Sequence, residues 1–142
     1  MCIRDRSWRG IDFPGGWHDA VHAGPATPER EDALIQSFSW YAEQLGYLLA
    51  RLDATPEGDG SLLDHTLVVV GNIFSTGAAH SHEGKTYLLA GGGAGLVGGQ
   101  NLDFGGATNG DLFTTILQAL GFEDTFFGER DFCTGPLAGV FA

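Results

Sequence analysis

The sequence predicts an α/β domain, because helical periodicity and buried-strand patterns alternate along a single chain of 142 residues. The predicted order is helix, strand, strand, helix. Apolar residues make up 43% of the chain, which is enough to bury the core of one domain. The first strand is a continuous β-branched run without alternation, which is typical of a parallel sheet covered on both faces.

The longest predicted element is a helix over residues 27 to 54. Thr27 stands at the N-cap position and Pro28 in the first turn, followed by acidic residues that the helix dipole favours. Pro56 and Gly58 follow its end. Apolar residues recur at alternating steps of four and three, namely Leu34, Phe38, Tyr41, Leu45, Leu48 and Leu52. This stripe predicts a helix packed against a large surface.

Two strands and a second helix follow in the chain. Segments 65 to 71 and 85 to 91 are expected to form neighbouring strands whose carboxyl ends share one edge of a sheet. After a loop rich in Gly and Asn, Asn109 is expected to cap a second helix that ends at Gly121. Its predicted buried face consists of Leu112, Phe113, Ile116, Leu117 and Leu120.

Charge and hydropathy exclude two classes of partner. The formal net charge is −11, and the seven Lys and Arg residues form no basic run, so nucleic acid is excluded as a ligand. No apolar stretch approaches the ~20 residues of a membrane span, and the N-terminus lacks the pattern of a signal peptide. The compartment stays open, and export of a parent protein remains an alternative.

The two cysteines, Cys2 and Cys133, make neither a zinc-type pair nor a disulfide framework. The opening MCIRDR resembles translated adapter sequence at the front of metagenomic reading frames, so residues 1–6 are left out of the fold prediction. Residues 1–14 are therefore interpreted as a leader, non-native in part, and residues 15–142 as one domain.

Gly93, Gly95 and Gly98 spell G-x-G-x-x-G after a predicted strand. A dinucleotide fingerprint needs a helix to open at that turn and to receive the pyrophosphate at its N-terminus. The chain continues GQNLDFGG, which is not a helical pattern, and no Gly-Lys-Ser/Thr ending marks a P-loop. A turned glycine connection is the favoured interpretation, and no nucleotide cofactor is expected.

Histidines form two clusters. His18 and His22 are four residues apart, a spacing that could place both on one helical face and on one metal ion, or leave them as unrelated loop residues. His80 and His82 flank Ser81 in the loop after the first strand, where α/β folds often bind ligands. His65 is expected to be a surface residue.

Residues 41–99, from YAEQLGY to GLVGG, resemble the C-terminal part of the HXXSHH family, a bacterial family of unknown function. More distantly the chain resembles the alkaline-phosphatase-like superfamily of metal-dependent hydrolases, over about residues 15 to 140. The resemblance implies a partial alkaline-phosphatase-like layered sheet with a long helix. It also implies that the chain is a C-terminal portion of a larger protein, whose nucleophile lies upstream.

The resemblance places metal-site positions on His18 and His22, and a later one on His80 or His82. HDAVHA stands where the HXXSHH family has its name-giving motif, with Val21 in place of the serine and Ala23 in place of the last histidine. An Asp-His pair expected after the strand is replaced by Asn72 and Ile73.

Four neutral imidazoles with few nearby acids, Asp19 and Glu83 among them, suit one transition-metal ion, zinc first, better than two cations held by carboxylates. The resulting hypothesis is a degenerate metal-dependent hydrolase-like domain acting on phosphate or sulfate esters. The alternative is a non-catalytic secreted or surface binding module that reuses the fold. In a third interpretation, the histidines are incidental to a folding fragment.

Overall fold

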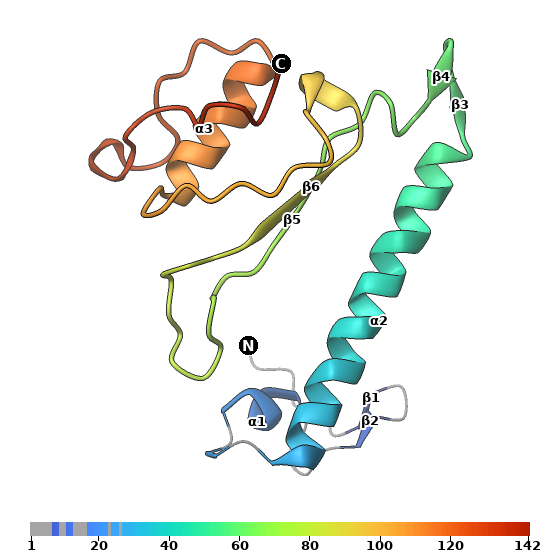
Figure 1. The fold of residues 1–142 in the computed structure, drawn as a ribbon, viewed down its shortest axis with the longest axis vertical. Helices are drawn as coiled ribbons and strands as arrows, with labels where there is room; N and C mark the ends of the chain where they lie inside the picture. The colour runs from blue at the N-terminus through green and yellow to red at the C-terminus, as the bar shows by residue number, and fades with distance from the viewer. Residues whose placement is uncertain (1–6, 9–10, 13–16, 23, 26) are drawn as a thin grey trace. The chain divides into compact units, whose positions relative to one another are not determined.

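The computed structural model describes residues 7–8, 11–12, 17–22, 24–25 and 27–142 (Figure 1). The chain divides into two compact units. Unit 1 comprises Met1–Leu48 and Ile73–Lys85, and unit 2 comprises Leu49–Asn72 and Thr86–Ala142. Residues 1–6, with Cys2, lie outside the described residues, as do most of the predicted leader and Ala23. The division into a leader and one domain stays a prediction.

Unit 1 begins with β1 (Ser7–Trp8) paired antiparallel with β2 (Ile11–Asp12), followed by α1 (Trp17–His22). The long helix α2 (Pro28–Asp53) starts in this unit and confirms the helix predicted over residues 27 to 54. Thr27 is its cap as predicted, because its hydroxyl accepts a 3.3 Å hydrogen bond from the backbone N–H of Arg30.

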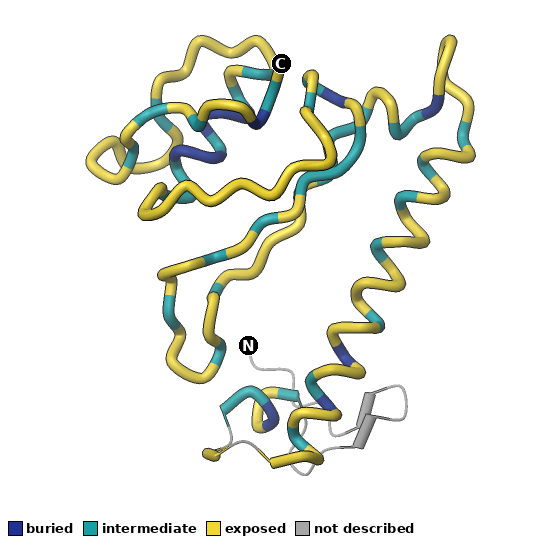
Figure 2. Tube along the Cα trace, in the orientation of Figure 1, coloured by how far each residue is buried: buried dark blue, intermediate teal, exposed yellow. Residues whose placement is uncertain are grey.

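The side chains that α1 and α2 bury are small. They are Ala20 on α1 and Ala33 and Ser37 on α2. The prediction that the large apolar stripe of α2 is buried is wrong within unit 1. Ile35, Phe38 and Tyr41 are 62%, 52% and 55% exposed. Figure 2 shows that α2 is exposed along much of its length. The physical reason is that α1 is only six residues long and meets the first turns of α2, where the edge of the Trp17 ring contacts Phe38 at a centroid distance of 5.6 Å.

Unit 2 contains two antiparallel pairs of strands. The short strands β3 (Pro56–Glu57) and β4 (Gly60–Ser61) form a hairpin after α2. The longer pair is β5 (Val68–Gly71) and β6 (Tyr87–Ala90), with Val68 opposite Ala90 and Gly71 opposite Tyr87. The Tyr87 ring lies over Gly71, so a side chain on residue 71 would force the ring to move.

The predicted strands are neighbours, but two further predictions about them are wrong. Their carboxyl ends do not share an edge, because the pair is antiparallel. The loop 72–86 between them contains no helix, and a parallel pair needs a long crossover connection, usually helical. The strand is also not covered on both faces, since Val69 and Val70 are 37% and 39% exposed.

The glycines after β6 pack against backbone. The N–H of Gly92 donates to Leu63 O at 2.9 Å, and the N–H of Gly93 donates to Thr66 O at 3.1 Å. A β-carbon on Gly93 would lie 2.6 Å from the nitrogen of Leu67, so close approach requires glycine there. Gly93–Gly95 form the 3₁₀ turn η1, and Gly95 has a φ of 74°, as a turned glycine connection predicts.

The second predicted helix is α3 (Asn109–Ala119), and Gly121 follows its end with a φ of 89°. The predicted cap is wrong by one residue. Thr108 caps the helix in a reciprocal box with Asp111, and Asn109 is the first helical residue. Leu112 and Ile116 are buried as predicted, whereas Leu120 is 54% exposed because it lies past the last helical turn.

Asp111 ties α3 to the C-terminal segment. Its carboxylate accepts hydrogen bonds from the backbone N–H groups of Thr108, Thr134 and Gly135. Burial raises the pKa of this carboxyl group, but these hydrogen bonds outweigh burial and hold the pKa at about 2. The segment includes the 3₁₀ turn η2 (Arg130–Phe132) and continues to a bridge between Leu96 and Phe141. Small antiparallel sheets and helices therefore make unit 2 a mixed α/β structure.

Candidate functional site: a histidine cluster in unit 1

The two histidines of α1 lie on one face of the helix. His18 and His22 are four residues apart, and their ring centroids are 4.6 Å apart with the planes tilted by 56°. Of the two interpretations of this spacing, the structure therefore supports the shared helical face. His22 is the last residue of α1 and is half-buried, while His18 is exposed.

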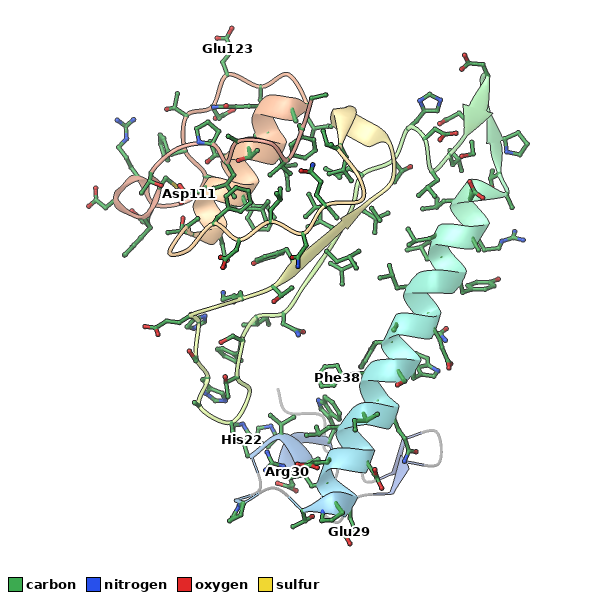
Figure 3. The ribbon with its side chains drawn as sticks, in the orientation of Figure 1. His22, Glu29, Arg30, Phe38, Asp111 and Glu123 are labelled. Carbon is green, nitrogen blue, oxygen red and sulfur yellow. The ribbon has the colours of Figure 1, made fainter. Side chains whose placement is uncertain are left out.

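The loop 73–85 brings His80 to His22. Their Nε2 atoms are 3.1 Å apart, and their rings meet edge to face with centroids 4.8 Å apart. A hydrogen bond at this distance needs one Nε2 to carry the hydrogen and the other to offer its lone pair, so the two roles depend on the tautomers of the rings. Figure 3 labels His22 at the end of α1 beside this loop.

Phe74 connects the remaining histidine to this pair. Its ring stacks on His80 at a centroid distance of 4.6 Å with an interplanar angle of 15°, and it contacts His82 at 4.9 Å. The rings of His18, His22, His80, Phe74 and His82 thus form a continuous row, which we call the histidine row.

The backbone of the loop fixes His80 in an unusual conformation. Its φ is 50°, a left-handed value that residues other than glycine rarely adopt and that costs of order 1 kcal/mol or more. Ser75 and Thr76 hold the adjacent Ser81: the N–H of Ser75 donates to Ser81 O at 2.9 Å, and the N–H of Ser81 donates to Thr76 O at 3.2 Å. The strain at His80 is therefore maintained by its neighbours.

The spacing of the two facing nitrogens suits metal coordination. Zinc ligands at about 2.0–2.1 Å from the ion are about 3.3 Å apart in a tetrahedral site. The 3.1 Å between the Nε2 atoms of His22 and His80 is close to this value. Among the residues that the structure describes, however, no group of three or more His, Cys, Asp or Glu side chains is placed to hold a metal ion.

The other residues singled out by the sequence lie as follows. The acids next to the row, Asp19 and Glu83, are exposed. Asn72 is exposed after β5, and Ile73 is 75% exposed. His65 is exposed, as predicted.

Sequence reasoning missed two residues of the site. Phe74 joins His80 to His82, and Gly77 allows the loop to approach α1, because a β-carbon there would overlap Val21 Cγ1. A single aromatic residue and a single glycine in a polar loop carry no pattern that identifies either role.

Comparison of the chain with protein families, curated proteins and solved structures found no match. Within the described part of the chain, no helix has the length and hydropathy needed to cross a membrane.

Proposed function

We propose that this chain binds one divalent transition-metal ion, zinc first, at the histidine row. The observation that carries the proposal is the 3.1 Å distance between the Nε2 atoms of His22 and His80, which come from segments 58 residues apart. Their spacing is near that of two ligands on one zinc ion, so small movements of two side chains would let both nitrogens bind it.

His18 and His82 are proposed as further ligands. Both are exposed and lie at the ends of the histidine row, so their side chains have space to rotate. Loss of the hydrogen between the two central nitrogens accompanies binding, because a ligating nitrogen must offer a lone pair. Water would complete the four ligands that zinc takes.

The donor set supports a transition metal over magnesium or calcium. Imidazole nitrogen suits zinc, copper, nickel and iron, whereas magnesium and calcium prefer oxygen ligands. Neutral imidazoles also leave the ion with its double positive charge. An exposed site of this kind would therefore attract water or an anionic ligand in its open positions.

The resemblance to alkaline-phosphatase-like hydrolases supports the same class of site. We propose that the chain corresponds to the metal-site half of such a fold, with its layered sheet represented only in part. Asn72 and Ile73 stand in place of an Asp-His pair, so the domain is proposed to be degenerate. A small ester or a surface ligand is the proposed partner of the bound ion.

The test is a zinc competition titration against a chromophoric chelator. The wild-type chain is expected to bind one zinc ion, and His22→Ala and His80→Ala are each expected to weaken binding by tenfold or more. His18→Ala and His82→Ala should weaken it less. The matched control is His65→Ala, which removes an exposed histidine of unit 2 and should leave the affinity unchanged. Absence of zinc binding, or equal losses in the His65 control, would overturn the proposal.

A further inference from the structure

Arg30 uses all three of its guanidinium nitrogens on α1 and the residues after it. Nε donates to Ala20 O at 2.6 Å, Nη2 donates to Val21 O at 3.0 Å, and Nη1 donates to Gly24 O at 2.7 Å. Figure 3 labels Arg30 near His22 in unit 1.

These contacts fall at the C-terminal end of α1, where the carbonyl oxygens need hydrogen-bond partners. The last carbonyls of a helix have no partner within the helix, and a positive charge is favourable at this end. A helix of six residues, such as α1, is also too short to be stable by itself. Arg30 therefore supplies the hydrogen bonds that keep the end of α1 helical and fixed to the first turn of α2.

His22 is the residue of α1 that this arrangement positions most directly. It follows Ala20 and Val21, whose carbonyl oxygens accept from the guanidinium. Val21 in turn lies against Gly77 of the loop that carries His80. The same short segment is thus held by Arg30 through its backbone and contacts the histidine loop through its side chains.

We propose that Arg30 is the positioning residue of the histidine pair, which holds His22 Nε2 within reach of His80 Nε2. This inference rests on the proposed metal site for its consequence, although the positioning itself concerns the metal-free pair. The role requires arginine, because only a guanidinium has donors in a planar fork that reach three separate carbonyls.

The experiment compares Arg30→Met and Arg30→Lys with Arg51→Met, which removes an exposed arginine in the last turn of the same helix. The first readout is the nitrogen NMR spectrum of the imidazole rings in metal-free protein, which reports the hydrogen bond between His22 and His80. The second is zinc affinity. Arg30→Met is expected to lose the NMR signature of the hydrogen bond between the two ring nitrogens. It is also expected to weaken zinc binding about 10- to 100-fold, as removal of an orienting partner typically does.

Arg30→Lys is expected to lie between Arg30→Met and the wild type, and Arg51→Met to match the wild type. Retention of both the signature and the affinity in Arg30→Met would overturn the inference. If the wild type shows the signature but binds no zinc, the proposed function fails, and the signature in the variants alone decides the role of Arg30. If Arg30→Met does not fold, the comparison of Arg30→Lys with Arg51→Met decides. Loss of the NMR signature in Arg30→Lys supports the role of Arg30, and an unchanged signature opposes it.

Discussion

Val21 of α1 lies so close to Gly77 that a β-carbon at residue 77 would overlap its Cγ1 atom. This close approach joins α1 to the loop 73–85 next to the contact between His22 and His80. A side chain at residue 77 would therefore force Val21 or the loop to shift next to the two histidines.

Gly77→Ala is expected to weaken zinc binding about tenfold, because the new methyl group pushes the loop away from α1 and separates the imidazoles. The measurement is zinc affinity by competition titration. Val21→Ala removes the Cγ1 atom that the methyl group would meet, so the double variant should recover most of the affinity. Gly98→Ala adds a methyl group in unit 2, where no atom lies within 4 Å, and serves as the control. Equal affinity in Gly77→Ala and wild type would contradict the expected role of Gly77.

Thr108→Ala is expected to lower the free energy of unfolding by about 1 to 2 kcal/mol, because it removes the cap of α3. Its hydroxyl accepts from the N–H of Asp111 at 3.2 Å and donates to Phe132 O at 2.6 Å. Asn109→Ala changes the residue that the sequence alone favours as the cap and should alter stability by less than about 0.5 kcal/mol. Chemical denaturation of both variants measures the difference, and a larger loss in Asn109→Ala would reverse the assignment.

Asp111 gives the stability of the chain an acid dependence. The pKa of its carboxyl group is lowered from 3.8 to about 2, so its stabilising contribution is fully present above pH 3.8 and is lost as the pH falls through about 2. Denaturation at a series of pH values should show the free energy of unfolding falling across this interval.

Asp111→Asn should reduce that pH dependence and cost about 2 kcal/mol at neutral pH, since an amide accepts more weakly from the same N–H groups. The matched variant is Asp103→Asn, whose carboxylate accepts from the N–H of Gly105 at 3.0 Å in an exposed turn. It should leave the acid dependence nearly intact. A wild-type profile that is flat between pH 4 and pH 2 would show that the hydrogen bonds to Asp111 do not stabilise its ionised form.

The zinc-loaded chain is expected to hydrolyse aryl phosphates and aryl sulfates no faster than zinc ions in buffer do. Such chemistry needs an activated nucleophile and a charge clamp on the transferred group. Ile73 offers no lone pair, and Asn72 offers no negative charge, at the positions where the resemblance expects ligands. Zinc-dependent turnover in the wild type that disappears in His22→Ala would show that the site is catalytic.

Local sequence signals predicted the elements well. The cap at Thr27, the periodicity of α2 and the glycine after α3 depend on neighbouring residues, which the sequence displays directly. The direction of β5 relative to β6 was predicted wrongly, because a continuous β-branched run indicates a strand but does not determine how it pairs. The missing helix in the loop 72–86 was the available sign of an antiparallel pair.

Within the candidate site, only the spacing of neighbouring histidines is a local signal that the sequence displays. The spacing of His18 and His22 left open one helical face or two unrelated loop residues, and the structure shows the shared face, since four residues make about one turn. The resemblance named His22 together with His80 or His82 as metal-site positions, and in the structure it is α1 and the loop 73–85 that bring His22 and His80 together. The contributions of Phe74 and Arg30 depend on contacts between distant segments, and nothing in the local sequence indicates them.

The interleaving of the two units along the chain has a consequence for synthesis and folding. Unit 1 needs residues 73–85 in addition to residues 1–48, and unit 2 needs residues on both sides of that loop. A growing polypeptide therefore cannot complete the first unit before His80 has left the ribosome. The contact between His22 and His80 closes a loop of 58 residues. The chain loses the conformational entropy of this loop before the contact contributes any stability. Contacts of this sequence separation slow folding, so we expect the histidine row to assemble late, after α2 has formed.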